Sequence, residues 1–195
     1  MIPNNVLETY KARIKKYAKG QIIFNEKETA KYYYQIQHGN VKMLNLTRDG
    51  KEFIQGFFYD GNAFGEPPLF TDFKYPASAV CVDDTSVYLL PKTSFFKLLT
   101  AHPEIHLNFT TILCKRMVYK AKIMKEVSIH PPEHRIITLL NHLKETSGKT
   151  TLYEVNLTRQ QISDLTGLRV ETVIRSIKKL EKSNKLSIKD RKVYL

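Results

Sequence analysis

Short apolar runs alternate with polar turns from Gly20 to Leu90, and these runs are rich in Ile, Val, Phe and Tyr. The runs are QIIF, YYYQIQ, VKMLNL, EFIQGFF, SAVCV and SVYLL, and the turn signals between them are Gly39-Asn40, Asp49-Gly50, Asp60-Gly61 and Asp83-Asp84. Regularly spaced strands with such turns are typical of antiparallel sandwiches and small barrels. The pattern therefore predicts an antiparallel β-domain, with Asp49-Gly50 as a hairpin turn. For the basic segment Asn5 to Tyr17 we expect a helix.

The hydrophobic period becomes helical near Thr93 and stays helical to about Ser128. Steps of three and four residues join a seam of mainly apolar positions, which are Ile105, Phe109, Ile112, Arg116, Tyr119 and Ile123. This spacing is typical of a two-stranded coiled coil, so we interpret the helix as a dimer interface. Arg116 interrupts the seam and keeps an alternative open, in which the helix packs on its own sheet. Pro131 and Pro132 end the helix, because successive prolines remove backbone donors.

After the prolines the pattern predicts a compact region of helices closed by a hairpin. We expect a helix at about Pro132 to Glu145, a strand at Thr151 to Val155, two short helices within Leu157 to Leu180, and a hairpin from Lys185 to Leu195. The two short helices share an apolar seam of Ile162, Leu165, Leu168, Val173 and Ile177. Gly167 suits the turn between them, because a residue without a Cβ adopts the left-handed conformation. A hairpin beside such a helix-turn-helix would be a wing.

The second short helix carries side chains that suit the reading of DNA bases. These are Arg169, Glu171, Thr172 and Arg175. Arginine has paired donors that match guanine O6 and N7, and a carboxylate accepts from cytosine N4 in the major groove. The alternative is a solvated helix face with ordinary pairing of Glu171 and Arg175. For phosphate contacts, which position a protein without specifying sequence, we expect Thr158, Arg159, Gln160 and Lys178.

Charge favours a polyanionic partner. The chain of 195 residues has a formal net charge of +12, and residues 130–195 hold 13 Lys and Arg against 7 Asp and Glu. Half of the net charge thus lies in one third of the chain, where the base-reading residues lie, and a basic surface attracts phosphates irrespective of sequence. We divide the chain into a domain at 1–100, a dimerisation helix at 101–129 and a DNA-binding domain at 130–195.

The residues around the apparent catalytic and metal-binding motifs do not allow the structures that these motifs need. His130, Glu133 and His134 match the zinc-protease pattern H-x-x-E-H, but that pattern needs one continuous helix, and Pro131 and Pro132 interrupt it. We therefore expect neither catalytic residues nor a metal site, and no enzyme activity. Cys81 and Cys114 lack metal-ligand spacing and are expected to be buried apolar side chains. Without a secretory signal or a membrane-spanning run, the protein is expected to be cytoplasmic.

Two motifs, in this order of elements, resemble a known family. Phe64-Gly65-Glu66 with Leu69-Phe70 matches a phosphate-binding cassette, and Thr158-Arg159-Gln160 with Glu171-Thr172 and Arg175 matches a DNA-recognition unit. From about Gly20 to Leu195 the chain resembles the superfamily of the cyclic AMP receptor protein and the fumarate and nitrate reduction regulator. The resemblance implies an α+β fold with an N-terminal antiparallel β-roll like that of cyclic-nucleotide-binding domains, a long dimerisation helix and a C-terminal winged helix-turn-helix. It implies a homodimeric transcription regulator that binds double-stranded DNA at a near-palindromic operator, with RNA polymerase as a further partner.

The cassette departs from the pattern of the cyclic AMP binders. Those proteins place Arg and then Ser or Thr at its end, where this chain has Pro76 and Ala77. A buried phosphate without a cation is costly, so the effector is not expected to be cyclic AMP. The candidate effector pocket consists of Gly65, Glu66, Lys74 and Ser78. No Cys precedes Cys81, as an iron–sulfur form would need, and isolated His38, His102 and His106 do not support haem. We therefore expect no cofactor and leave the effector unknown. In the alternative function, small-molecule sensing by the β-roll is primary and DNA binding is secondary.

Overall fold

The computed structural model describes residues 1–47, 50–71, 73–149 and 151–195, and for residues 127–129 it describes the backbone alone. Residue contacts divide the chain into two compact units, 1–114 and 115–195. Of the predicted hairpin turn, Asp49 lies outside the described residues, and its neighbour Gly50 has a φ of +77°. Among the described helices, none has both the length and the apolar character needed to cross a lipid bilayer.

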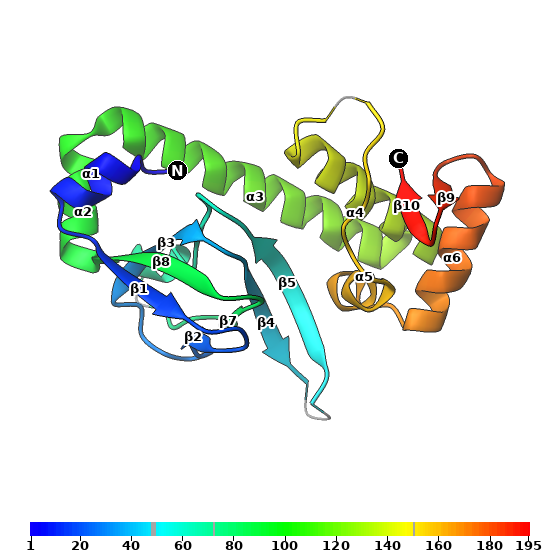
Figure 1. The fold of residues 1–195 in the computed structure, drawn as a ribbon, viewed down its shortest axis with the longest axis horizontal. Coiled ribbons are helices and arrows are strands. Elements are labelled where there is room, and N and C mark those ends of the chain that lie inside the picture. Colours follow the sequence, from blue (N-terminus) through cyan, green and yellow to red (C-terminus); the bar gives the residue numbers. More distant parts are fainter. Residues whose placement is uncertain (48–49, 72, 150) are drawn as a thin grey trace. The chain divides into compact units, whose positions relative to one another are not determined.

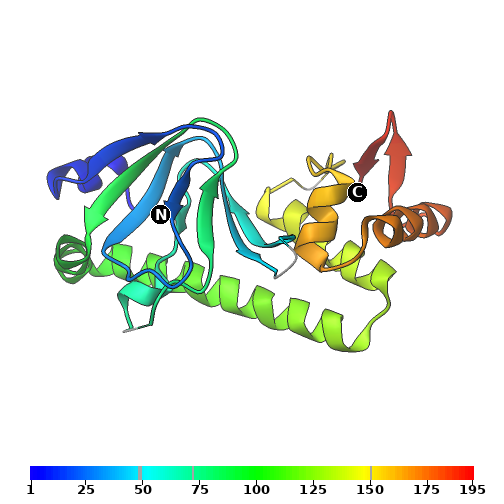
Figure 2. The ribbon, with the colours of Figure 1, turned by 90° about the horizontal axis from the view of Figure 1, so that it is seen from below.

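Two antiparallel four-stranded sheets form the body of the first unit, which confirms the predicted β-domain (Figure 1). One sheet has the order β1-β8-β3-β6 and the other the order β2-β7-β4-β5. The strands are β1 Arg13–Tyr17, β2 Ile22–Phe24, β3 Tyr32–His38, β4 Val41–Leu46, β5 Glu52–Phe58, β6 Ala63–Phe64, β7 Ser78–Cys81 and β8 Thr85–Pro91. Figure 2 shows the sheets curving around a common interior. Alternating apolar side chains fill that interior, since successive residues of a strand point to opposite faces.

The expected helix over Asn5 to Tyr17 is wrong beyond its first turns. Helix α1 covers Asn4–Thr9, and β1 follows as an edge strand that pairs antiparallel with β8. Four of the five β1 residues are exposed, so this strand has almost no apolar face and gives no alternating signal. Its register comes from backbone pairing with a buried neighbour, and exposed charges are common on edge strands.

The helical stretch expected from Thr93 to Ser128 consists of two helices. Helix α2 covers Lys92–Ala101, and α3 covers Pro103–Ile129. The break lies at His102, whose backbone has φ −129° and ψ 76°. A proline favours the first position of a helix and disfavours helical conformation in the residue before it, so Pro103 starts α3 and separates it from α2.

Part of the predicted coiled-coil seam packs on the chain itself. Phe109 is 2% exposed, and its ring centroid lies 5.5 Å from that of Phe95 and 5.7 Å from that of Phe70. Ile105 packs against the same core, and farther along α3 the ring of Tyr119 stacks on His142 at 3.5 Å. The open alternative thus applies to Ile105 and Phe109, because large apolar side chains lose most water by packing on their own domain.

Cysteine burial is only half as expected. Cys81 is buried in β7, whereas Cys114 is exposed on α3. The expectation that both are buried apolar side chains is therefore wrong for Cys114. Cys114 lies on a face of α3 that is exposed to solvent.

Three helices and a hairpin form the C-terminal part of the second unit. They are α4 Pro132–Thr146, α5 Arg159–Thr166, α6 Val170–Lys182, β9 Ser187–Lys189 and β10 Lys192–Tyr194. The hairpin confirms the predicted wing. The strand expected at Thr151 to Val155 is reduced to one bridge, Glu154 to Tyr194. Backbone bonds from Tyr153 to Leu195 and from Val155 to Val193 hold this segment beside β10, but β10 is too short for a longer ladder.

Candidate nucleic-acid interface

The predicted helix-turn-helix is present in α5 and α6, and one glycine makes its turn. Gly167 ends α5 in the left-handed conformation, with φ 67° and ψ 16°. The hydroxyl of Ser163 donates to the carbonyl of Leu168 at 2.5 Å, which ties α5 to the turn. The predicted seam is confirmed, since Ile162 and Val173 are fully buried, Ile177 is 1% exposed, and Leu165 and Leu168 pack against the same core.

Contacts from α4 fix the orientation of both helices. Arg135 of α4 donates from Nη1 to the carbonyl oxygen of Thr166, the last residue of α5, at 3.1 Å. Glu133 of α4 lies 2.8 Å from Nζ of Lys179 and accepts from the hydroxyl of Ser176 at 3.3 Å, and both partners are in α6. The hydrogen bond from Lys179 holds the pKa of the Glu133 carboxyl below its ordinary value. These contacts hold α5 at its end and α6 along one face, so that the remaining face of α6 is presented in a defined orientation.

The first turns of α6 expose the residues predicted to read bases. Arg169 is at the N-cap position of the helix. Arg169, Glu171 and Arg175 are exposed, while Thr172 is half-buried. In the part of the chain that the structure describes, no ion pair joins Glu171 to Arg175. Ile174, at 41% exposure, lies between them and adds an apolar contact surface. The four residues are thus brought together at one helix end.

The residues predicted to contact phosphate lie at the starts and edges of these helices. Thr158 caps α5: its hydroxyl oxygen accepts from the backbone of Gln161 at 3.1 Å, and the Gln161 side chain accepts from the backbone of Thr158 at 2.8 Å. This arrangement leaves the Thr158 hydroxyl proton free to donate outward. Gln160 is exposed and bonded to Asp164 at 2.7 Å, whereas Arg159 is half-buried. Lys178 is exposed on α6, in contrast to Lys179, which is paired with Glu133.

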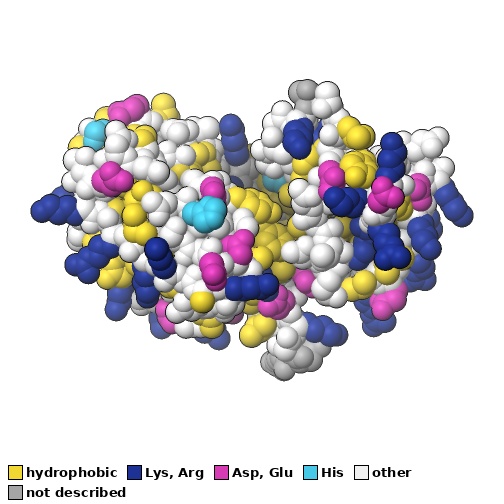
Figure 3. Space-filling model, in the orientation of Figure 1, with side chains coloured by type: hydrophobic (Ala, Val, Ile, Leu, Met, Phe, Trp, Pro, Cys, Tyr) yellow, Lys and Arg dark blue, Asp and Glu magenta, His cyan; other side chains and the backbone are white. Residues whose placement is uncertain are grey.

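The wing adds two basic residues that the sequence pattern did not single out. Its turn consists of Asp190 and Arg191, which have φ of 49° and 65°, as a two-residue hairpin with a primed turn requires. Lys189 and Arg191 are exposed at the tip. A signal was available, since the tip of a predicted wing rich in lysine and arginine lies beside a predicted reading helix. Figure 3 shows Lys and Arg side chains gathered over α6 and the wing.

The candidate effector residues differ in burial. Gly65 and Glu66 follow β6, and Glu66 is 1% exposed. Ser78 accepts a hydrogen bond from the backbone of Glu26 at 2.9 Å, while Lys74 is exposed. The interior beside Gly65 is filled by an aromatic stack, in which the ring centroids of Phe24 and Tyr75 are 3.7 Å apart. At the end of the cassette Ala77 is fully buried and Pro76 is exposed, so neither supplies a cation.

Replacement of Gly65 by alanine is expected to destabilise the first unit by about 2 to 4 kcal/mol. Gly65 has φ +71°, and a Cβ there would lie 2.7 Å from Cζ of Phe24 and 3.3 Å from Cε1 of Tyr75. Gly61→Ala is the matched control, because Gly61 has φ +76° and no atom within 4 Å of the added Cβ. Urea unfolding of both variants separates the two costs. Equal losses at the two positions would show that contact with the aromatic stack is unimportant.

Known proteins resemble both units. Residues 14–102 match the cyclic nucleotide-binding domain and residues 134–195 match the Crp-like helix-turn-helix domain. The fumarate and nitrate reduction regulatory protein of Yersinia pestis is 24% identical over 98% of this chain and 76% of its own length. The cAMP-activated global transcriptional regulator CRP of Salmonella typhimurium is 27% identical over 89% of this chain and 85% of its own length. Among solved structures, a CooA mutant from Carboxydothermus hydrogenoformans has a TM-score of 0.80 and 17% identity, and covers 100% of this chain and 87% of its own.

Proposed function

The chain belongs to the superfamily of the cyclic AMP receptor protein and the fumarate and nitrate reduction regulator, and from this premise we propose that it is a homodimeric regulator that binds a specific, near-palindromic operator. The relatives that span most of its length are transcription regulators. In the proposed complex, Arg169, Glu171, Thr172 and Arg175 contact base edges. Thr158, Arg159, Gln160 and Lys178 contact phosphates, joined by Lys189 and Arg191 of the wing.

The observation that supports this proposal most is the unpaired, exposed start of α6. Guanidinium and carboxylate groups are strongly solvated, and a surface helix gains about 0.3 to 0.5 kcal/mol by pairing them four residues apart. Here Glu171 and Arg175 have that spacing and stay apart, while Lys179 of the same helix is paired with Glu133 of α4. Unpaired hydrogen-bond donors and acceptors on a helix held in place by α4 can match the pattern of donors and acceptors that base edges display in the major groove.

A second heptad face of α3 supports the dimer. Positions at alternating steps of three and four residues are all exposed, and they are Leu107, Thr110, Cys114, Met117, Ala121 and Met124. The side chains of Leu107, Met117 and Met124 are 69 to 70% exposed, whereas Leu and Met are usually buried in folded proteins. A seam of this spacing is buried when two such helices form a coiled coil. We therefore assign the dimer interface to this face, whose positions lie one or two residues after those of the seam expected from the sequence.

Selection of bound duplexes from a random library tests the proposed function. Two copies of α6 related by a two-fold axis should recover inverted repeats whose half-site centres are about 34 Å, or one helical turn, apart. The selection is run with and without a panel of nucleotides, so that effector dependence is seen in the same experiment. Enrichment of no sequence under any condition would contradict the proposal.

We propose RNA polymerase as a further partner at promoters that contain the selected operator. A run-off transcription assay with the recovered operator tests this proposal.

Cyclic AMP and cyclic GMP are expected to leave the melting temperature unchanged. A ligand that binds only the folded state raises the melting temperature with concentration, and the cassette lacks a cation to balance a buried cyclic phosphate. The aromatic rings of Phe24 and Tyr75 also lie directly against Gly65. Thermal denaturation over a nucleotide series checks this. A saturable rise would contradict it and favour the alternative, a sensing module with secondary DNA binding.

A further inference from the structure

Three potential metal ligands recur at four-residue intervals across the junction of α3 and α4. Glu126 is in the last turn of α3, His130 lies between the helices, and His134 is in the first turn of α4. In one continuous helix each four-residue step would rise about 6 Å, which would hold Glu126 and His134 about 12 Å apart. The chain instead reverses at Pro131, whose backbone is extended with φ −66° and ψ 162°. The prolines that remove the zinc-protease helix therefore fold the three side chains together.

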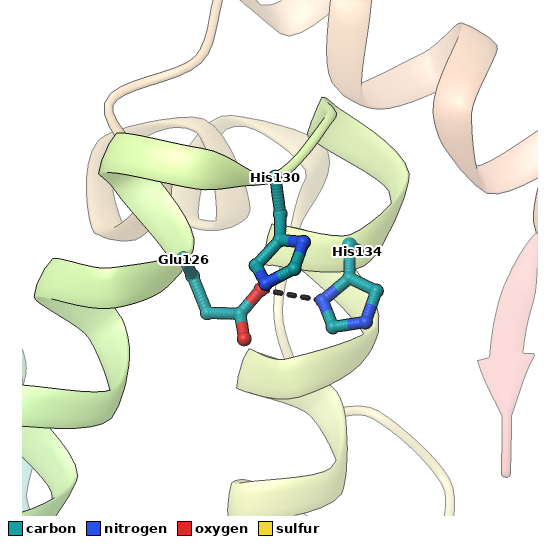
Figure 4. Close-up of side chains that lie close together, drawn as sticks. All are labelled: Glu126, His130 and His134. Atoms are coloured by element: carbon teal, nitrogen blue, oxygen red, sulfur yellow. Dashed lines mark hydrogen bonds and ion pairs between the residues drawn. The ribbon is translucent and has the colours of Figure 1, made fainter.

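The side chains converge on one small volume (Figure 4). Nδ1 of His134 lies 2.5 Å from Oε2 of Glu126. The ring centroids of His130 and His134 are 4.3 Å apart with an interplanar angle of 21°. One donor atom from each of the three residues lies within 4.8 Å of the other two. All three residues belong to the same compact unit, so their arrangement is that of a single folded body.

The donor set selects a class of ion. Two imidazoles and one carboxylate suit late first-row transition metals, whereas Mg²⁺ and Ca²⁺ prefer oxygen ligands. Zinc binds histidine nitrogen and carboxylate oxygen at about 2.0 to 2.2 Å, which places tetrahedral donors about 3.3 Å apart. The separations of up to 4.8 Å bracket that value, so small side-chain rotations suffice. Three protein ligands would leave one position for water or another ligand.

The cluster is buried on the side of Glu126 and open to solvent on the side of His134. Glu126 is 8% exposed, and Thr138 hydrogen-bonds to its carboxylate, as an outer partner that orients a ligand does. The His134 side chain is 48% exposed, so an ion can enter from that side. An ordinary ion pair accounts for Glu126 and His134 alone. It does not account for the position of the His130 ring, which stacks on the His134 ring.

We propose that Glu126, His130 and His134 bind one divalent transition metal ion per chain, of the class of Zn²⁺, at the junction of α3 and α4. The residues flanking His134 contact the DNA-binding helices: Glu133 binds Lys179 of α6, and Arg135 binds the end of α5. A bound ion fixes His134 to the end of α3 and thereby constrains α4. Its effect on DNA affinity rests on the proposed function, whereas the metal site does not.

Calorimetric titration of the full chain with Zn²⁺, and the visible absorption of bound Co²⁺, test the site. We expect one ion per chain, a metal-dependent rise in melting temperature, and at least about tenfold weaker binding in Glu126→Gln, His130→Ala and His134→Ala. His106→Ala is the control, because His106 is exposed on the same helix and far along the chain from the cluster. His134→Ala leaves a buried carboxylate without its imidazole and risks misfolding. Among the described residues, the His130 side chain makes a ring contact with His134 and no hydrogen bond, so His130→Ala keeps the test decisive.

Binding that is unchanged in His130→Ala and Glu126→Gln, or that is lost equally in His106→Ala, overturns the proposed site. Operator affinity measured with and without one equivalent of Zn²⁺ then tests the coupling. A change in the unmodified chain that disappears in His130→Ala supports it, and no change in a chain that binds the metal refutes the coupling alone. Loss of specific DNA binding with intact metal binding would refute the proposed function and leave the site standing.

Discussion

The double variant Met117→Glu/Ala121→Glu is expected to be a folded monomer that binds its operator at least about 100-fold more weakly, because the link between two half-sites is lost. Met117 is 69% exposed in the single chain, and Ala121 is exposed as well, so the charges do not disturb the fold of the protomer. In a symmetric coiled coil each carboxylate would instead be buried opposite its own copy, without a partner. Analytical ultracentrifugation gives the mass, and circular dichroism verifies the fold.

Asn108→Glu is the matched control for this result. Asn108 is exposed on α3 outside this heptad pattern, on the other side of the helix, so the added charge should leave the dimer intact. A dimeric double variant would place the interface elsewhere on the molecule. A dimeric double variant combined with a monomeric Ile112→Glu would return the interface to the seam first expected from the sequence.

Arg175→Ala is expected to weaken operator binding by about 1 to 3 kcal/mol per half-site, which is roughly 5- to 150-fold, and to relax specificity at one base pair. Arg175 is exposed and has no ion-pair partner among the described residues, so its removal should change stability by less than about 0.5 kcal/mol. Fluorescence anisotropy with the operator, with each single-base variant and with random duplex measures both effects. An equal loss on operator and random DNA would show that Arg175 contacts phosphate.

Lys178→Ala provides the contrast within the same helix. Lys178 is exposed one turn farther along α6, where a long ammonium chain suits the DNA backbone. Its removal should weaken binding to all sequences alike and reduce the salt dependence of binding by about one unit per contact. A loss confined to one base pair in this variant would exchange the roles of the two residues.

Most of the strands and the whole helix-turn-helix could be predicted from the sequence, because burial of one face imposes a period that the residues display. The strand runs recur as β2, β3, β4, β5, β7 and β8, and Gly167 stands at the turn with a positive φ. β1 could not be predicted in this way, since its register depends on hydrogen bonds to β8 and four of its five residues are exposed.

The limits of periodicity are clearest in α3. The helix has two apolar faces, and sequence spacing does not say which of them packs on the same chain. The face with Phe109 carries the larger apolar side chains and fills the core of the β-roll, while the face with Met117 is exposed. The cluster of Glu126, His130 and His134 was missed for a related reason, because its proximity comes from a reversal of the backbone that spacing along one helix does not describe.

The affinity of the purified chain for a selected operator, relative to a random duplex of equal length, tests the central claim most directly. At about 0.15 M ionic strength the general attraction of a basic protein for phosphate is partly screened, and specific contacts dominate the difference. The account predicts that the operator is bound at least about 1,000-fold more tightly than the random duplex. Equal affinities for the two duplexes would contradict it.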